Sequence, residues 1–307
     1  MMAKTWRDVR GFLADAAGRI LLWICISTAV SALLYWRHAV TLLQEISEIV
    51  PGETQIYPIA GIVFVGAFIL FKHREIMESL KKEAEMGLAL KVRLAGLMLA
   101  LAPTVLLQDM PVEMDISAAI LATVWLGIFA AVNPKTSRML MPYAALYLAS
   151  TLSPKIIYPL AGEPLADFAV FIVGPAAKAI GIPVLQSGRS LTFTALNGET
   201  ISFTISPDCS SISSITVFLL LCGLMHLDLK KRASVTLLFA VMGTAVLTLL
   251  NALRIVILLW VGYVGGDWTL WNVHGWLGYA IMIGFYALAA KIYLSIEYNR
   301  KPAGYKI

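Results

Sequence analysis

Long apolar runs alternate with short polar segments along most of this chain of 307 residues. The longest runs reach about 17 to 20 residues, enough for a helix to cross a bilayer core of roughly 30 Å. The pattern predicts an all-α polytopic membrane protein with about eight transmembrane helices, in a range of eight to ten. The expected spans are residues 18–36, 56–71, 94–108, 116–132, 139–152, 210–227, 234–253 and 275–294.

Residues 153–208 interrupt this pattern. Several prolines fall in this segment, and each is expected to break a helix. We interpret the apolar stretch 165–182 as an interfacial or re-entrant helix on the outer side of the membrane, with a pair of short spans as the alternative. The prolines are Pro154, Pro159, Pro164, Pro175 and Pro183.

A hairpin is expected at the end of the same segment. Residues 191–195 and 200–205 each alternate apolar and polar side chains. Between them lies Asn197-Gly198, the dipeptide most typical of a tight hairpin turn. The pattern predicts a small extracytoplasmic β-hairpin that leads directly to Cys209.

Composition and charge placement support a membrane location. Only 14% of the residues are charged, whereas a soluble domain carries roughly 25%. With eight spans all five basic clusters fall on one side, so the positive-inside rule predicts a cytoplasmic (inner) membrane protein with both termini in the cytoplasm. The clusters are Arg7, Arg10 and Arg19; Lys72, Arg74, Lys81, Lys82, Lys91 and Arg93; Lys135 and Arg138; Lys230, Lys231 and Arg232; and Arg300, Lys301 and Lys306.

The same features limit the alternatives. The N-terminus resembles a signal peptide, with Val30-Ser31-Ala32 as a cleavage-like site. A retained first span is favoured because the topology counts correctly with it. No basic run is interleaved with aromatic residues in a polar domain, so no nucleic-acid partner is expected.

This topology places three reactive side chains at one depth. The span 210–227 runs inward, which puts Cys209 at the outer face. The next span starts inside, and Arg254 lies roughly 30 Å further along, at the outer boundary again. The last span runs inward from His274. A thiol, a permanent cation and a proton shuttle at one level are the parts that acyl transfer needs.

Cys209 has two interpretations. Ser206 is suited to cap a helix that has Pro207 in its first position, and this places Cys209 in the first turn. Free N–H groups and the helix dipole would there favour a thiolate, which the charge of Asp208 opposes. The alternative is an interfacial cysteine that only packs.

Arg254 and His274 are equally open to two interpretations. An arginine within an apolar run is either a snorkelling anchor or a fixed donor for a developing oxyanion. Asn251, one turn earlier, either orients Arg254 or caps a kink. His274 is either a wetted interfacial histidine beside tryptophans or the general base and acid that serves the thiol.

Other chemistry is not indicated by the sequence. Cys25 and Cys222 lie inside apolar runs and are interpreted as small buried hydrophobic residues, so no disulfide framework is expected. No helix carries metal-ligand spacing, and no glycine-rich phosphate loop is present, so neither a metal nor a cofactor is expected.

The ordered motifs resemble the exosortase/archaeosortase family of membrane cysteine transpeptidases over roughly residues 140–295. The matching features are Cys209 at the start of a late span, Asn251-x-x-Arg254 at the end of the next, and His274 opening the last. The chain departs from many relatives in having Asp208 before the cysteine and Ser210 after it, with no glycine following.

The resemblance implies a role for each residue and a class of partner. Cys209 would be the nucleophile, Arg254 and His274 would complete the catalytic site, and Asn251, Asp208 and Ser210 would support it. The expected partners are secreted proteins with a C-terminal signal made of a short motif, one membrane helix and a basic tail. A membrane lipid or another surface acceptor would receive the acyl chain.

We therefore expect one integral membrane domain with three parts: a five-span bundle at 1–152, an extracytoplasmic or interfacial segment at 153–208, and catalytic spans at 209–307. The alternative function is a non-enzymatic transporter or assembly scaffold that uses Arg254 and Asn251 as a buried polar pathway. The absence of an inverted repeat in the sequence disfavours a transporter.

Overall fold

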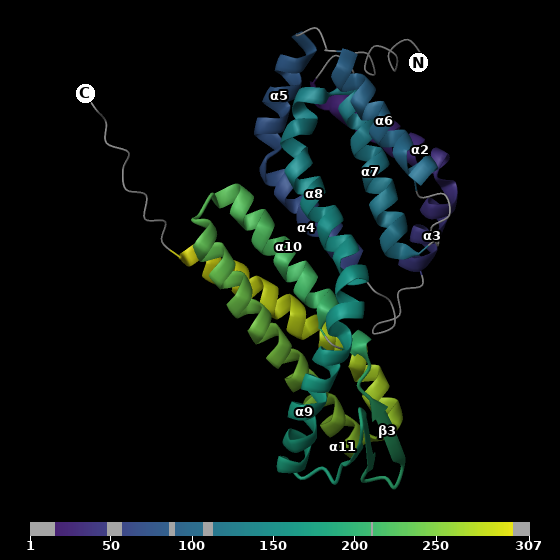
Figure 1. Cartoon of the computed structure of the whole chain (residues 1–307), viewed down its shortest axis with the longest axis vertical. Coiled ribbons are helices and arrows are strands. Elements are labelled where there is room, and N and C mark those ends of the chain that lie inside the picture. Colours follow the sequence, from purple (N-terminus) through teal and green to yellow (C-terminus); the bar gives the residue numbers. More distant parts are fainter. Residues whose placement is uncertain (1–15, 48–56, 86–89, 107–112, 210, 297–307) are drawn as a thin grey trace, which may run out of the picture. The chain divides into compact units, whose positions relative to one another are not determined.

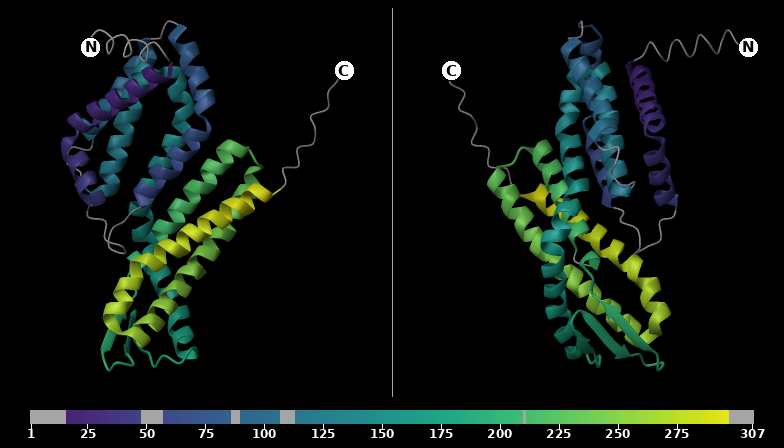
Figure 2. Two further views of the ribbon diagram at one scale, coloured as in Figure 1. Left: turned by 180° about the vertical axis from the view of Figure 1, so that it is seen from behind. Right: turned by 45° about the vertical axis from the view of Figure 1, so that its right-hand side comes forward.

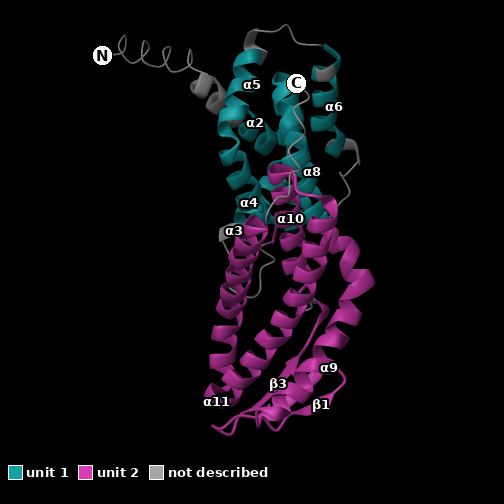
Figure 3. Cartoon of the chain, turned by 90° about the vertical axis from the view of Figure 1, so that its left-hand side faces the viewer, with its two compact units in different colours: residues 1–49, 58–152 teal, residues 50–57, 153–307 magenta. Residues whose placement is uncertain are grey.

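The protein is mostly helical and carries one small sheet (Figure 1). The computed structural model describes residues 16–47, 57–85, 90–106, 113–209 and 211–296. The chain forms two compact units, shown separately in Figure 3. Unit 1 comprises Met1–Ile49 and Pro58–Leu152, and unit 2 comprises Val50–Tyr57 and Ser153–Ile307.

Unit 1 is a bundle of apolar helices. Helices α6 and α7 pack most closely, because a side chain added at Gly96 or Gly127 would lie 2.5 Å from the backbone of the facing helix. Such small-residue contacts are typical of helices that associate in membranes. The helices are α2 (Ala16–Leu34), α3 (Trp36–Ser47), α4 (Tyr57–Phe71), α5 (His73–Glu85), α6 (Leu90–Leu106), α7 (Met114–Val132) and most of α8 (Pro134–Ile157).

Residues 153–179 do not form the broken segment that their prolines predict. Helix α8 continues through a π-helical turn, η1 (Tyr158–Gly162), into α9 (Glu163–Ala179). The prediction of repeated breaks is wrong. Pro159 and Pro164 fall at the starts of η1 and α9, where proline needs no hydrogen bond, whereas Pro154 and Pro175 lie inside α8 and α9 without ending them. The helix predicted over 165–182 is present as α9, with ends that differ by two or three residues. Its position relative to the membrane stays a prediction.

The predicted hairpin is present and gains a third strand. Strands β2 (Ser190–Thr194) and β3 (Thr200–Thr204) pair in antiparallel fashion around the turn, with Leu191 opposite Phe203. A short strand, β1 (Leu185–Ser187), pairs with the other edge of β2, so the order is β1-β2-β3. All three residues of β1 are exposed, and a strand without apolar alternation gives no signal in the sequence.

The apolar face of the sheet covers α9 and α11 in unit 2. Leu191, Phe193, Ile201, Phe203 and Ile205 are each at most 4% exposed. They form one cluster with side chains of α9 and α11, and Cys209 packs against it. Each such buried side chain contributes roughly 1.5–3 kcal/mol to the stability of the fold.

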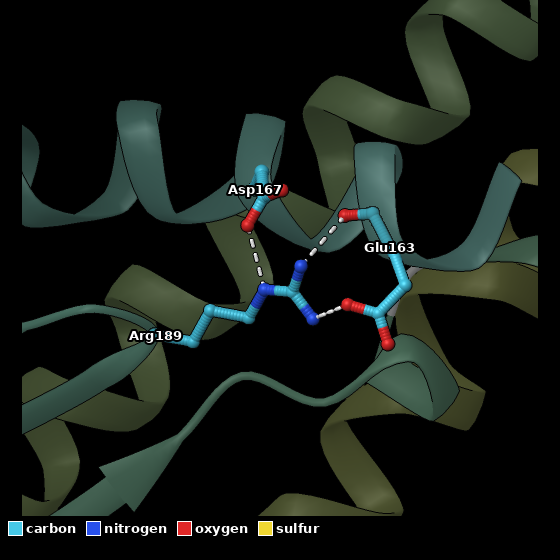
Figure 4. A network of polar contacts seen from close by, with 3 residues as sticks. All are labelled: Glu163, Asp167 and Arg189. Atoms are coloured by element: carbon cyan, nitrogen blue, oxygen red, sulfur yellow. Dashed lines mark hydrogen bonds and ion pairs between the residues drawn. The ribbon is translucent and has the colours of Figure 1, made fainter.

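An exposed ion-pair cluster fastens the sheet to α9 (Figure 4). Arg189, in the turn between β1 and β2, donates from Nε to Asp167 at 2.6 Å and forms an ion pair with Glu163. The hydrogen bonds to Asp167 and Glu163 raise the pKa of the Arg189 guanidinium above its ordinary value. Because these groups are exposed, the cluster contributes little to stability.

Two predicted spans near the C-terminus are longer than expected. After α10 (Ile212–Leu229), α11 runs over Ala233–Ser295 as two helices that meet at Gly266. Figure 2 shows the two halves of α11 running back along each other. Arg254 and His274 were expected at helix ends, and this is wrong: both lie inside helices, because the apolar run continues beyond Arg254 to Val264.

The tip of the hairpin secures this break. Gly266 has φ 80° and ψ −179°, a conformation that essentially only glycine adopts. The N–H of Leu196 donates to the carbonyl of Tyr263 at 2.9 Å, and the carboxylate of Glu199 accepts from the N–H of Asp267 at 3.0 Å. Hydrogen bonds with Asn197 and then with Asp267 lower the pKa of Glu199 below its ordinary value. The hairpin thus binds both helix ends that the break exposes.

The structure agrees with a helical membrane protein. Among the described residues, four helical segments are long and apolar enough to cross a bilayer. The predicted number of about eight spans stays a prediction, since several of the expected spans correspond to shorter apolar helices. The four segments are Met114–Val132, Pro134–Ala179, Ile212–Leu229 and Ala233–Ser295.

Substitution of Gly266 tests the role of the break. Gly266→Ala should lower the free energy of unfolding by about 1–3 kcal/mol, because the backbone is strained for alanine. Its new methyl group would also lie 2.5 Å from the side chains of Asn197 and Glu199. Thermal unfolding in detergent measures the effect.

The control is Gly284→Ala on the second half of α11, where an added methyl group meets no atom within 4 Å. It should stabilise the helix slightly, by up to about 1 kcal/mol. Equal effects of the two substitutions would contradict a special role for Gly266.

Candidate functional site

Cys209 lies in a tight turn that joins the sheet to α10. Pro207–Cys209 form a 3-10 turn, η2, and α10 begins only at Ile212. A helical turn does begin at Pro207, as expected, but it is a single 3-10 turn that ends at Cys209. Ser211, left-handed with φ 67°, separates it from α10, so Cys209 does not lie in the first turn of the long helix. The dipole of α10 therefore does not act on the thiol in the way that the sequence suggested.

Ser206 contacts the thiol rather than the backbone of a helix. Its hydroxyl lies 3.7 Å from Sγ of Cys209, and its carbonyl accepts the Cys209 N–H at 2.9 Å. The π turn η1 packs behind η2, with Gly162 against Pro207. The π turn therefore forms the surface against which the turn of Cys209 packs. π turns are frequent at functional sites.

Asn251 connects the cysteine turn to α11. Its side chain is only 3% exposed, and Nδ2 donates to the carbonyl of Cys209 at 2.5 Å. The bond fixes the backbone that carries the thiol against the first half of α11. The sequence suggested that Asn251 either orients Arg254 or caps a kink. In the structure it instead bonds to the backbone of Cys209.

Arg254, one turn after Asn251, reaches across to the second half of α11. Nη2 donates to the carbonyl of His274 at 3.0 Å and lies 3.4 Å from Nε2 of the same residue. Gly278 makes room for the guanidinium, because an added Cβ would lie 2.9 Å from Cζ of Arg254. The side chain lies between the two helix halves, a position that does not fit a snorkelling anchor.

The charge of Arg254 acts on Cys209. The guanidinium is close enough to the thiol for an electrostatic interaction, and it interacts similarly with Tyr279. The structure therefore places the permanent cation of Arg254 near the thiol of Cys209.

His274 is held by aromatic side chains. Its ring centroid lies 5.4 Å from that of Trp271 and 6.3 Å from that of Phe203 on β3. Within the described part of the chain its Nδ1 is buried and has no hydrogen-bond partner, as is also true of Nε of Arg254. Such buried polar atoms need a partner, and a bound substrate is one source of it.

The structure brings Cys209, Asn251, Arg254 and His274 into one region of unit 2. For the other two expected residues, the side chain of Asp208 and all of Ser210 lie outside the described part of the chain. Sγ of Cys209 contacts Ser206, while the imidazole is bonded to Arg254. The catalytic roles of these residues stay a prediction.

Sequence reasoning did not find the supporting residues. Phe203 faces the site because it alternates with the exposed residues of β3, and Gly278 follows His274 by one helical turn. Both signals are visible in the sequence once the positions of the helix halves are known. Across the described residues, no group of three or more histidine, cysteine or acidic side chains is arranged to hold a metal ion.

A comparison with protein families agrees with this arrangement. The model of the family described as transmembrane exosortase (Exosortase_EpsH) matches residues 52–289, well over half of the chain. The chain belongs to the transmembrane exosortase family. No match to a curated protein or to a solved structure was found.

Membership in the exosortase family points to a membrane transpeptidase that acts on sorting signals. The match also extends beyond the late motifs, because it includes most of unit 1 as well as Cys209, Arg254 and His274. The exosortase region therefore includes the front helices from α4 onward, for which the sequence offered no resemblance beyond hydrophobicity.

Removal of the Asn251 amide tests how the cysteine turn is held in this exosortase. Asn251→Ala should lower the free energy of unfolding by about 1–3 kcal/mol, because the buried carbonyl of Cys209 loses its donor. The measurement is thermal unfolding in detergent. Asn272→Ala, which alters an exposed asparagine on the same helix, should have little effect, and a comparable loss there would argue against the assignment.

Proposed function

We propose that this exosortase-family protein is a membrane-embedded cysteine transpeptidase. It would cleave the C-terminal sorting signals of secreted surface proteins and transfer the acyl chain to a lipid or another surface acceptor. One observation carries the proposal: a thiol, a guanidinium and an imidazole from separate segments converge in unit 2, around the bonds from Asn251 to Cys209 and from Arg254 to His274. We further propose a cytoplasmic-membrane location, with both termini in the cytoplasm and the site at the outer face.

The reaction begins with attack of Cys209 on the scissile peptide. The Sγ–carbon bond forms while the thiol proton passes to His274. The ring nitrogen available for this proton is Nδ1, which has no partner among the described residues. Nδ1 can accept this proton only when the neutral imidazole carries its own proton on Nε2. In that tautomer Nε2 cannot accept from Nη2 of Arg254, 3.4 Å away, and the guanidinium keeps its bond to the His274 carbonyl.

Arg254 supports the tetrahedral intermediate. Its Nε, buried and without a partner in the described structure, is a donor for the oxyanion that develops on the scissile carbonyl. A charged donor in a site that excludes water stabilises such an oxyanion strongly. Collapse of the intermediate breaks the carbon–nitrogen bond, and the imidazolium of His274 protonates the leaving amine.

A second nucleophile completes the cycle. The thioester on Cys209 is attacked by an acceptor such as a lipid amine, or by water. His274 accepts the proton of this nucleophile and returns it to the thiolate as the carbon–sulfur bond breaks. No metal or cofactor has a step in this sequence.

The alternative of a transporter or assembly scaffold is less well supported. It requires Asn251 and Arg254 to line a polar pathway. Instead, Asn251 is bonded to the carbonyl of Cys209, and Arg254 is bonded to the carbonyl of His274. Because both side chains are hydrogen-bonded to main-chain carbonyls of the protein, they are poorly suited to line a path for a solute.

Replacement of Cys209 tests the nucleophile. In cells that co-express a secreted protein with a sorting signal, Cys209→Ala should abolish cleavage, because no other group can form the thioester. Cys222→Ala alters a buried cysteine of α10 that is 2% exposed and should cleave normally. Immunoblotting measures the processed fraction, and full processing by Cys209→Ala would rule out the mechanism.

Replacement of Arg254 tests the oxyanion donor. Arg254→Lys keeps the charge but loses the planar fork and its Nε, so cleavage should slow by about 10²–10³-fold, as it does when an oxyanion donor is removed. The same change at Arg189, on the sheet–α9 cluster, should leave cleavage near the wild-type rate. Similar rates for Arg254→Lys and wild type would contradict this role.

A further inference from the structure

The pairing of β2 with β3 determines which backbone groups of β3 face outward. The N–H of Ala195 donates to Glu199 at 2.8 Å, and the N–H of Ile205 donates to Arg189 at 3.0 Å. In an antiparallel pair hydrogen-bonded positions alternate, so Ile201 and Phe203 bond to β2. The N–H and C=O groups of the residues between and beside them point to the other edge of β3; these residues are Thr200, Ser202 and Thr204.

This edge has none of the features that usually protect a strand from pairing. Strand β3 reads Thr-Ile-Ser-Phe-Thr, without a charge or a proline. Across the described residues, the outward backbone groups of Thr200, Ser202 and Thr204 form no hydrogen bond with another segment. The opposite edge of the sheet is the shorter strand β1, with only three residues. An unprotected edge of this kind is a template for another extended chain.

The free edge leads to the candidate site. Strand β3 ends at Thr204, and the chain reaches the turn of Cys209 after Ile205 and Ser206. The side chain of Phe203 contacts the rings of Trp271 and His274. An extended segment bound along β3 would therefore pass His274 and arrive at the thiol.

We propose that the substrate binds by adding a strand to the β3 edge, in parallel with β3, through the residues that precede its scissile bond. This inference rests on the proposed function. The parallel direction follows from the order of the signal, in which the motif precedes the membrane helix. A segment that runs with β3 delivers its C-terminal end to Cys209 and leaves the following helix free to enter the membrane.

Strand addition also specifies what the site reads. The backbone of the substrate supplies the hydrogen bonds, so they do not depend on its sequence. Successive side chains point to opposite faces of the enlarged sheet. One set would lie beside the hydroxyl groups of Ser202 and Thr204, and the other would lie toward Trp271 and His274. Specificity would therefore alternate along the motif.

A proline in β3 tests this mode of binding. Ser202→Pro removes an N–H that points to the free edge, while the bonds from Ile201 and Phe203 to β2 remain. Cleavage of a co-expressed substrate should fall about tenfold or more, through lost backbone bonds and the blocked edge. Ser202→Ala also loses the hydroxyl but keeps the N–H, so it is the matched reference and should cleave faster than Ser202→Pro by that factor. Gln186→Pro places a proline on the outer edge of β1 and should cleave normally.

Three outcomes would overturn strand addition. They are cleavage by Ser202→Pro at the rate of Ser202→Ala, an equal loss in Gln186→Pro, and a wild-type dimer that Ser202→Pro converts to a monomer. The last would show that a second copy of this chain occupies the edge. None of these outcomes contradicts the proposed function. That function would be contradicted only if Cys209→Ala still cleaved the substrate. The rate at which a small thiol reagent modifies Cys209 should be the same in Ser202→Pro as in wild type, which confirms a folded site.

A scan of the substrate gives a second test. Single prolines placed upstream of the scissile bond should impair cleavage at every second position, because alternate N–H groups face β3. A uniform effect along the motif, or none, would overturn strand addition.

Discussion

The break in α11 is the constraint on which the rest of unit 2 depends. A helix that continued straight beyond Arg254 would carry His274 away from it. At Gly266 the chain instead takes a conformation reserved for glycine and returns along itself. The hairpin binds the two open helix ends through Leu196 and Glu199. The same sheet leads into the turn of Cys209, so one element orders both the helix break and the proposed nucleophile.

Polar groups within these helices are held by specific bonds, and a few atoms are left available. Asn251 uses its amide to hold the carbonyl of Cys209, and Arg254 holds the carbonyl of His274. The buried atoms without partners in the described structure include Nε of Arg254 and Nδ1 of His274. A charge at membrane depth is retained where it has a function. The open donor and the open ring nitrogen are the two atoms that the proposed acyl transfer at Cys209 would use.

Much of this arrangement was predictable from local patterns. The hairpin follows from strict alternation around Asn197-Gly198. The shared depth of Cys209, Arg254 and His274 in the membrane, which loop charges and helix rise suggest, stays a prediction. The errors have physical causes. A charge does not end a helix when its side chain finds a carbonyl across the bundle, so the helices extend past Arg254 and His274. Prolines did not break residues 153–179: two of them begin the π turn and α9, and Pro154 and Pro175 lie inside α8 and α9 without ending them. Ser211 in a left-handed conformation separated Cys209 from α10, and nothing in a serine predicts that.

The central claim is that Cys209 carries the acyl chain during the reaction. The most direct measurement is mass spectrometry of the enzyme after rapid acid quench with a substrate that bears a sorting signal. The account predicts an adduct with the mass of the substrate's N-terminal fragment on the peptide that contains Cys209, and hydroxylamine should release it. A processed substrate with an adduct on another residue, or with none at any time point, would contradict the account.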